Sequence, residues 1–129
     1  MPPTEHLQRV PQVALDRLLH QGLFTTGVFL EVSETRTRRI YLADQIGVDT
    51  TDIDAWRDEA LLLNLANFGQ EQQRILTQAG IIGLKDLIAC EAEEFHERVA
   101  EAAYTLGVEA PSELTIQGWY DLAQVLADD

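Results

Sequence analysis

The chain repeats itself, and this repeat restricts the fold more than any other feature of the sequence. When the sequence is shifted by 58 positions, seven residues fall on matching positions in one register. The pairs are Leu7 and Leu65, Val10 and Phe68, Pro11 and Gly69, Gln12 and Gln70, Leu18 and Leu76, Gly22 and Gly80, and Leu23 and Ile81. The offset then grows to 60 at Gly47 and Gly107, and to 63 at Trp56 and Trp119. The chain therefore reads as two similar units in tandem.

Both units are expected to be helical. Apolar residues recur at three- and four-residue spacing, and no run of alternating β-branched residues predicts a strand. The pattern in each unit predicts a helix with a glycine stop, a short helix, a longer helix that ends at a Gly-Val pair, and a capped helix with a tryptophan. We therefore predict an all-α fold of seven to eight short helices, in which residues 1–64 and 65–129 share one core.

Residues 65–81 are predicted to form a helical hairpin at the centre of the second unit. Asn67 and Gly69 lie where the chain reverses, and both residue types tolerate a positive φ. Gly80 follows an apolar pair, so we expect it to end the second helix in the left-handed conformation. The candidate binding element in this turn consists of Asn67, Phe68, Gly69 and Gln70.

Three aspartates, Asp49, Asp52 and Asp54, lie at the entry to a long helix expected over about residues 52–66. They lack the glycine and the terminal glutamate of a calcium loop, so helix capping is the better interpretation. The tryptophans Trp56 and Trp119 occupy matching positions in the repeat, and we expect both to anchor the core.

Charge and composition exclude several classes of protein. The chain has 9 basic and 22 acidic residues, and its net charge of −13 argues against broad affinity for a phosphate backbone. Residues 65–129 are the more acidic half, with three basic and twelve acidic side chains. The longest apolar run, residues 60–63, is too short to span a bilayer, and the N-terminus lacks the pattern of a signal peptide. We expect a cytoplasmic protein without a membrane partner.

Residues with catalytic or metal-binding chemistry are few and scattered. His6, His20 and His96 are isolated from one another, so ordinary surface or packing roles are the better interpretation. The single cysteine, Cys90, has no activating neighbour and reads as a small buried residue. The sequence contains no Ser-His-Asp order, glycine-rich phosphate loop or metal-ligand cluster. We predict that the protein is not an enzyme and has no catalytic residues, no cofactor and no metal.

Two charged clusters are candidate contact surfaces. The only basic cluster consists of Arg36, Arg38 and Arg39. A solvated helix face explains it most simply, but it is also where a nucleic acid or an acidic partner would bind. The acidic cluster consists of Glu94, Glu97 and Glu101, which fall on one side of a predicted helix. That side would suit a basic partner.

The hairpin resembles the helix-hairpin-helix module. The residues that carry the resemblance are Leu65, Ala66, Asn67, Phe68 and Gly69, then Ala79, Gly80 and Ile81, and then Asp86 and Leu87. With the upstream unit included, the whole chain resembles a family of tandem helix-hairpin-helix-like domains of unknown function, related to modules of ligases and repair proteins. The resemblance implies one such repeat over residues 1–64 with the Trp56 helix, and a second over residues 65–129 with the Trp119 helix.

The turns depart from the pattern of the DNA-binding members of this superfamily. In those members, turn glycines let backbone N–H groups approach a phosphate, and a basic residue follows the turn. Here Asn67 replaces the first glycine, and Gln70 and Glu71 stand where the basic residues would be. In the first repeat, Pro11 removes an amide donor from the turn. These departures point away from non-specific DNA binding.

Two functions remain open from the sequence. The first is a non-catalytic helical module that binds another protein through acidic and apolar surfaces. The second is an accessory protein of DNA repair, or another nucleic-acid-binding protein, that uses either the second turn or the arginine cluster. The charge disfavours the second function, and the sequence specifies neither the partner nor the oligomeric state.

Overall fold

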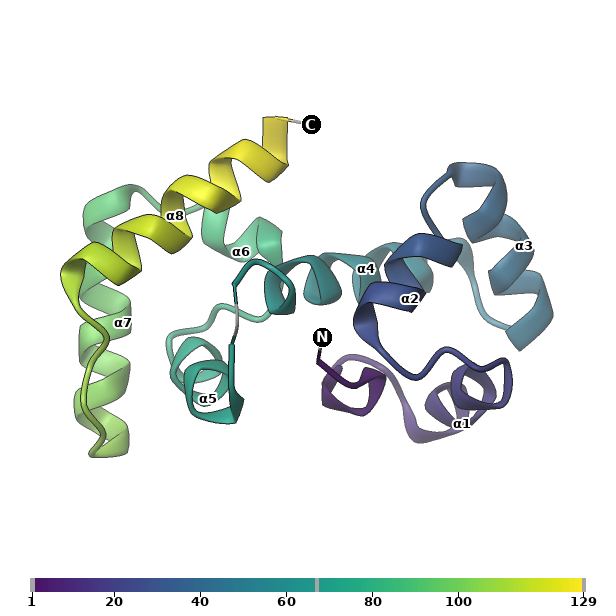
Figure 1. Ribbon diagram of the computed structural model, residues 1–129, viewed down its shortest axis with the longest axis horizontal. Helices are drawn as coiled ribbons and strands as arrows, with labels where there is room; N and C mark the ends of the chain where they lie inside the picture. The colour runs from purple at the N-terminus through teal and green to yellow at the C-terminus, as the bar shows by residue number, and fades with distance from the viewer. Residues whose placement is uncertain (1, 67, 129) are drawn as a thin grey trace. The chain divides into compact units, whose positions relative to one another are not determined.

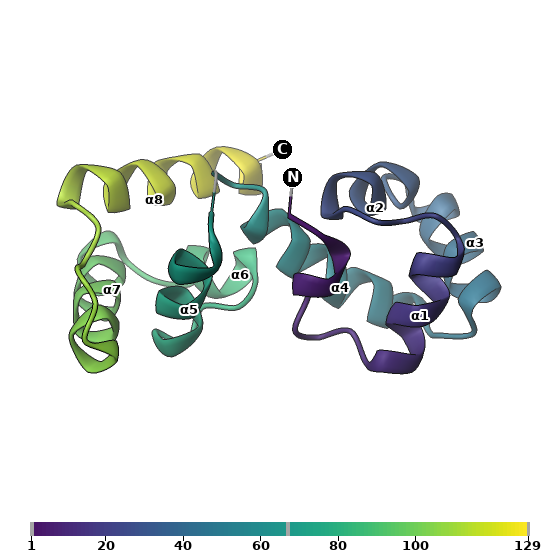
Figure 2. The same cartoon turned by 60° about the horizontal axis from the view of Figure 1, so that its bottom comes forward.

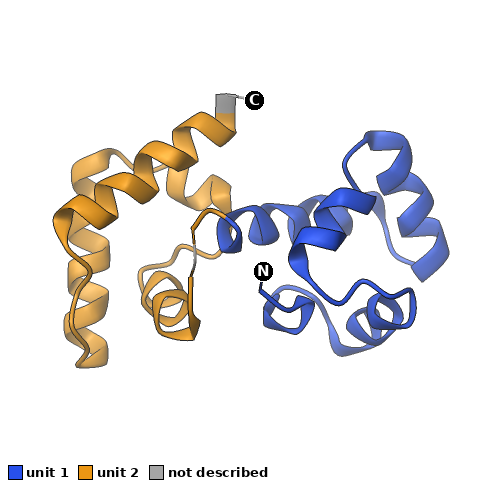
Figure 3. Ribbon diagram, in the orientation of Figure 1, with its two compact units in different colours: residues 1–64 blue, residues 65–129 orange. Residues whose placement is uncertain are grey.

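The computed structural model describes residues 2–66 and 68–128. Within these ranges it contains eight α-helices, one short 3-10 helix and no strand, which confirms the predicted all-α fold. An isolated antiparallel bridge joins Pro3 and Thr25. The chain divides into two compact units, Met1–Asn64 and Leu65–Asp129 (Figure 3). That the two units share one core stays a prediction.

Unit 1 consists of a 3-10 helix and four α-helices (Figure 1). They are η1 (Thr4–His6), α1 (Gln12–His20), α2 (Thr26–Val32), α3 (Arg36–Ile46) and α4 (Thr50–Leu63). Helix α4 packs against α2 and α3, while α1 packs against η1 and α3. The apolar side chains of the four α-helices meet in one core, in which Leu18, Phe29 and Ile53 are fully buried.

Unit 2 has the same order of helices. They are α5 (Gln70–Gln78), α6 (Leu84–Ile88), α7 (Ala92–Leu106) and α8 (Glu113–Asp128). Figure 2 shows α8 running across α6 and α7, and α5 packs against α7. These contacts correspond to those of α4 with α2 and α3, and of α1 with α3, in unit 1. The expected core positions of the two tryptophans are confirmed, because Trp56 and Trp119 are both buried.

Left-handed glycines end the first helix of each unit. Gly80 has a φ of 81°, its N–H donates to the Thr77 carbonyl at 3.0 Å, and the Ile81 N–H donates to the Leu76 carbonyl at 2.8 Å. This pair of hydrogen bonds satisfies carbonyls that a helix end leaves without partners. Gly22 has a φ of 83° and the same two hydrogen bonds, so the predicted glycine stops are confirmed. Gly47 and Gly107 end α3 and α7 in the same conformation.

The prediction of a positive φ at Gly69 is wrong. This residue is extended, with φ −85° and ψ −178°, and it is the N-cap of α5. Its N–H donates to the Gln72 side-chain oxygen at 2.8 Å. Gly69 therefore begins a helix, as an extended N-cap residue normally does, and it does not reverse the chain. Asn67, the other residue expected to adopt a positive φ, lies outside the described residues.

Helix α4 begins two residues earlier and ends three residues earlier than expected. The Asp49 N–H donates to the Asp52 carboxylate at 3.2 Å, which confirms the predicted capping role for these two residues and extends the helix back to Thr50. Asp54 lies inside the helix and forms an ion pair with Arg39. The helix ends at Leu63, with Asn64 as its C-cap. None of the helices within the described residues is long and apolar enough to cross a bilayer.

The left-handed cap at Gly80 is tested by comparing two glycine-to-alanine variants. Gly80→Ala places a Cβ on a residue with positive φ and should lower the free energy of unfolding by about 1 kcal/mol. Gly118→Ala lies inside α8, where an added Cβ meets nothing within 4 Å, and should raise it by about 0.5–1 kcal/mol. Urea unfolding followed by circular dichroism measures both values. Effects of the same sign would contradict the assignment.

Candidate functional site

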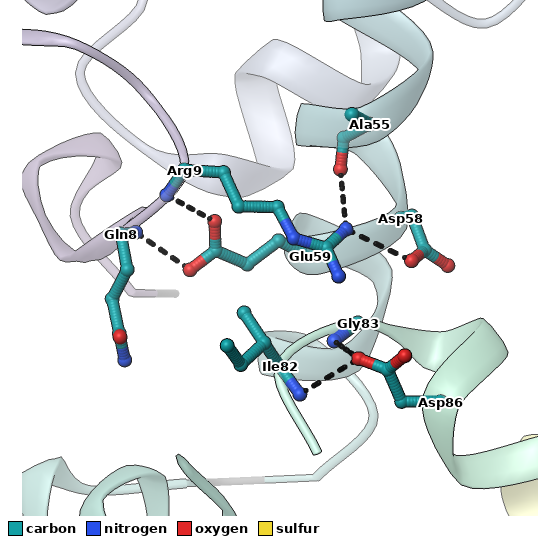
Figure 4. A network of polar contacts seen from close by, with 8 residues as sticks. All are labelled: Gln8, Arg9, Ala55, Asp58, Glu59, Ile82, Gly83 and Asp86. Atoms are coloured by element: carbon teal, nitrogen blue, oxygen red, sulfur yellow. Dashed lines mark hydrogen bonds and ion pairs between the residues drawn. The ribbon is translucent and has the colours of Figure 1, made fainter. Parts of the chain in front are cut away.

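The segment that leads into α1 points two consecutive backbone amides at one buried carboxylate. The Gln8 N–H donates to Glu59 Oε2 at 2.6 Å, and the Arg9 N–H donates to Glu59 Oε1 at 2.9 Å (Figure 4). Glu59 projects from α4 and is only 1% exposed. Each carboxylate oxygen thus accepts one amide, and a segment 50 residues away in sequence is joined to α4.

The Arg9 side chain continues this network along α4. Its guanidinium donates to the Ala55 carbonyl at 3.0 Å and forms an ion pair with Asp58, also at 3.0 Å (Figure 4). Burial raises the pKa of Glu59, while the two amide donors and the Arg9 charge act in the opposite direction. Arg9 therefore contributes to the network twice, through its backbone and through its side chain.

This geometry decides what the first turn can bind. Two adjacent N–H groups that converge on one point form an anion site, and a phosphate oxygen would suit it as well as a carboxylate does. Glu59 already occupies this position, so an external anion would have to displace a buried side chain. Sequence reasoning missed Glu59, although its spacing from Trp56, Ala60 and Leu63 places it on the buried face of α4.

The second turn differs from the first at the position that matches Glu59. Leu122 stands 63 positions after Glu59 and cannot accept a hydrogen bond. Instead, the Phe68 ring packs edge-on against Trp119, with ring centroids 4.9 Å apart. Of the four residues of the predicted turn element, Phe68 thus packs, Gly69 caps α5 and Gln70 is exposed at its first turn. Asn67 lies outside the described part of the chain.

Unit 2 does use a carboxylate at the start of its short helix. Asp86 Oδ2 accepts the N–H groups of Ile82 and Gly83, both at 3.0 Å (Figure 4). In this case the donors lie only three and four residues before the acceptor. The contact is therefore a local cap of α6, whereas Glu59 makes a long-range contact.

Matching positions in the last helices of the two units also donate a hydrogen bond to a backbone carbonyl within or just after the short helix of the unit. Arg57 donates to the Leu30 carbonyl at 2.9 Å, and Tyr120, 63 positions later, donates to the Cys90 carbonyl at 2.9 Å. Cys90 is a buried free cysteine, as predicted, and burial raises the pKa of its thiol. A thiol of this kind is a poor nucleophile.

The arginine cluster separates into two kinds of side chain. Arg39 is half-buried, donates to the Ser33 and Glu34 carbonyls at 3.1 and 3.0 Å, and forms an ion pair with Asp54 at 3.1 Å. It therefore holds α3 in place. Arg38 and Arg36 are exposed on the same helix, and Arg38 donates to the Glu31 carbonyl at 3.1 Å. Two of the three arginines remain accessible to a partner.

A groove lies beside Arg38 in unit 1, which we call the α3 groove. It has a volume of about 460 Å³ and is lined by Gln21, Leu23, Val32, Thr37, Arg38, Tyr41, Leu42 and Gln45. Leu23 and Leu42 are buried, whereas Tyr41 is 64% exposed. Sequence reasoning missed the groove because its lining comes from α2, α3 and the end of α1, and only the tertiary packing brings these together. An exposed tyrosine beside an arginine was the available signal.

The acidic cluster lies on α7, where Glu94, Glu97 and Glu101 are all exposed. Glu94 forms an ion pair with Arg98 at 3.1 Å. His96 contacts the Gln117 side chain at 2.9 Å through its Nε2 atom. Within residues 2–66 and 68–128, no group of three or more His, Cys, Asp or Glu side chains could hold a metal ion.

Residues 8–126 match the model of the family described as Domain of unknown function (DUF4332). The chain belongs to this family. The DUF4332 match covers Glu59, the α3 groove and most of α8. No curated protein and no solved structure matched the chain. The relation of this DUF4332 chain to helix-hairpin-helix modules stays a prediction.

Glu59→Gln tests the contact between the first turn and α4. Glutamine offers one acceptor oxygen for two amides and turns an NH₂ group toward the other, so a buried donor is left without a partner. We expect the free energy of unfolding to fall by about 1–3 kcal/mol in chemical denaturation at neutral pH. Glu101→Gln, on the exposed side of α7, is the control and should change it by less than about 0.5 kcal/mol.

The stability difference between wild type and Glu59→Gln should also depend on pH. Because the folded-state pKa of Glu59 is raised above its ordinary value of 4.5, the folded chain binds the proton more tightly than the unfolded chain. The proton-linked part of the contribution of Glu59 should thus be fully present below pH 4.5 and be lost as the pH rises through the folded pKa, whereas the contribution of the two amide hydrogen bonds is still present at neutral pH. The stability difference between wild type and Glu59→Gln should shrink with rising pH in this window. A difference that grows would mean that the amide donors outweigh burial.

Proposed function

We propose that this DUF4332 protein is a non-catalytic helical module that binds another protein, with the α3 groove as its contact site. The observation that carries the proposal is the composition of the groove, which has a buried apolar floor, the exposed ring of Tyr41 and the charge of Arg38. Its volume of about 460 Å³ suits a few partner side chains. An amphipathic helix with acidic residues beside its apolar face has the matching chemistry.

Several contacts favour a protein over a nucleic acid as the partner. The amides of the first turn already donate to Glu59, and Arg39 is engaged within unit 1. Of the accessible charges, Arg38 lines an apolar groove, whereas Arg36 is exposed outside its lining. Phosphate recognition needs several cations along a polar track, and the net charge of −13 repels a polyanion.

We further propose that the two units are helix-hairpin-helix-like repeats. Support comes from their common order of helices, the equivalent helix contacts, and the left-handed glycines at offsets of 58 and 60. In this proposal the first repeat keeps the shape of a phosphate-binding turn but fills it with its own carboxylate. The acidic face of α7, formed by Glu94, Glu97 and Glu101, remains available for a basic partner.

The test compares Tyr41→Glu with Tyr104→Glu. Both tyrosines are exposed, but only Tyr41 lines the groove, while Tyr104 is 86% exposed on α7. Immobilised wild type and Tyr104→Glu should retain the same protein from the source cells after chemical cross-linking. Tyr41→Glu should lose it at least about tenfold, because the new carboxylate is buried against the apolar floor on binding.

A DNA-binding assay addresses the alternative function. Wild type should not change the fluorescence anisotropy of a labelled duplex at physiological salt. The proposal fails if the duplex binds, if binding weakens steeply with salt, and if the Arg36→Ala, Arg38→Ala double variant loses it. It also fails if no protein distinguishes Tyr41→Glu from Tyr104→Glu.

A further inference from the structure

Helix α8 is apolar on two neighbouring faces, one buried and one exposed. Its inner face packs in unit 2 through Ile116, Trp119 and Ala123, which are all buried. A second set of residues forms what we call the α8 stripe: Leu114, Gly118, Leu122, Val125 and Leu126. At 3.6 residues per turn these positions fall within a sector of about 120° that lies next to the inner face. The apolar side chains of the stripe are 38–85% exposed.

An exposed stripe of this kind calls for a second partner. A helix with one polar face covers its apolar face by packing on its own domain, but α8 keeps four large apolar side chains on its outer side. Gly118 lies among them, and nothing stands within 4 Å of the place where its Cβ would be. A glycine within the stripe allows another backbone or a bulky ring to approach closely.

The acidic charge of α8 indicates that the surface of such a partner is basic. The helix contains three acidic residues and no basic residue. Asp121 borders the stripe, is exposed, and accepts a hydrogen bond from the Gln117 side chain at 2.9 Å. The α3 groove offers the complementary surface, because its apolar floor lies beside the exposed Arg38.

We propose that the α8 stripe of one molecule docks into the α3 groove of a second copy of this chain. The proposal rests on the proposed function, since it names the protein that the groove binds. Val125 and Leu122 enter the groove beside Tyr41, and Asp121 pairs with Arg38. The two surfaces differ, so the contact is heterologous, and a docked pair still has one free groove and one free stripe for further copies.

Two variants that each lose one surface test this arrangement. Tyr41→Glu should abolish binding through the groove and leave the stripe intact. Val125→Asp should abolish binding through the stripe and leave the groove intact. Sedimentation equilibrium of wild type should show a mass that rises with concentration, whereas each variant alone should remain a monomer. An equimolar mixture of the two variants should form a one-to-one dimer and nothing larger, because it contains one intact groove and one intact stripe.

Matched controls separate docking from misfolding. Tyr104→Glu and Val13→Asp introduce the same charges at exposed positions outside both surfaces, since Tyr104 is 86% and Val13 63% exposed. Both should associate as wild type does. Arg38→Asp and Asp121→Arg should each weaken association at least about tenfold, and the protein with both changes should recover most of it, because the pair is restored with its charges exchanged.

Two results would overturn the proposal. One is a wild type that stays monomeric at every concentration, and the other is a mixture of Tyr41→Glu and Val125→Asp that fails to dimerise. If the protein is monomeric but a different protein is still captured by wild type and lost by Tyr41→Glu, self-docking is wrong and the proposed function stands. If neither a second copy nor another protein binds the groove, both are wrong.

Discussion

Unit 1 depends on the buried carboxylate of Glu59, which accepts hydrogen bonds from two backbone amides at the entry to α1. A buried charge without donors is strongly unfavourable, and buried amides without an acceptor are also costly. Each side of this contact therefore requires the other. The contact joins the first turn to α4, the helix that also carries Trp56 into the core. It also gives the turn an anion of its own, so an external anion would have to displace Glu59 to bind there.

Unit 2 solves the same packing problem with aromatic residues. Its turn is held by the contact between Phe68 and Trp119, and Leu122 stands at the position that matches Glu59. Leu122 is apolar and is 48% exposed. The divergence of the two units at this one position thus leaves a polar internal contact in unit 1 and part of an exposed apolar stripe in unit 2.

Local features of the structure could be predicted from the sequence, and long-range contacts could not. The left-handed cap at Gly80 depends on a glycine after an apolar helix, and that signal lies within a few residues. The roles of Glu59 and Arg39 depend on carbonyls, amides and carboxylates that the fold brings together from other helices. Gly69 was assigned the wrong φ because glycine suits both a reversal and an N-cap. The α3 groove required the packing of three helices to be known.

The central claim is that Glu59 fills the first turn and leaves it unable to bind an external phosphate. Titration of ¹⁵N-labelled protein with a short DNA duplex and with inorganic phosphate measures this directly through the amide resonances of Gln8 and Arg9. Both amides should keep their chemical shifts throughout the titration and should exchange slowly with solvent, because both donate to a buried carboxylate. Saturable shifts of these two amides on addition of either ligand would contradict the account.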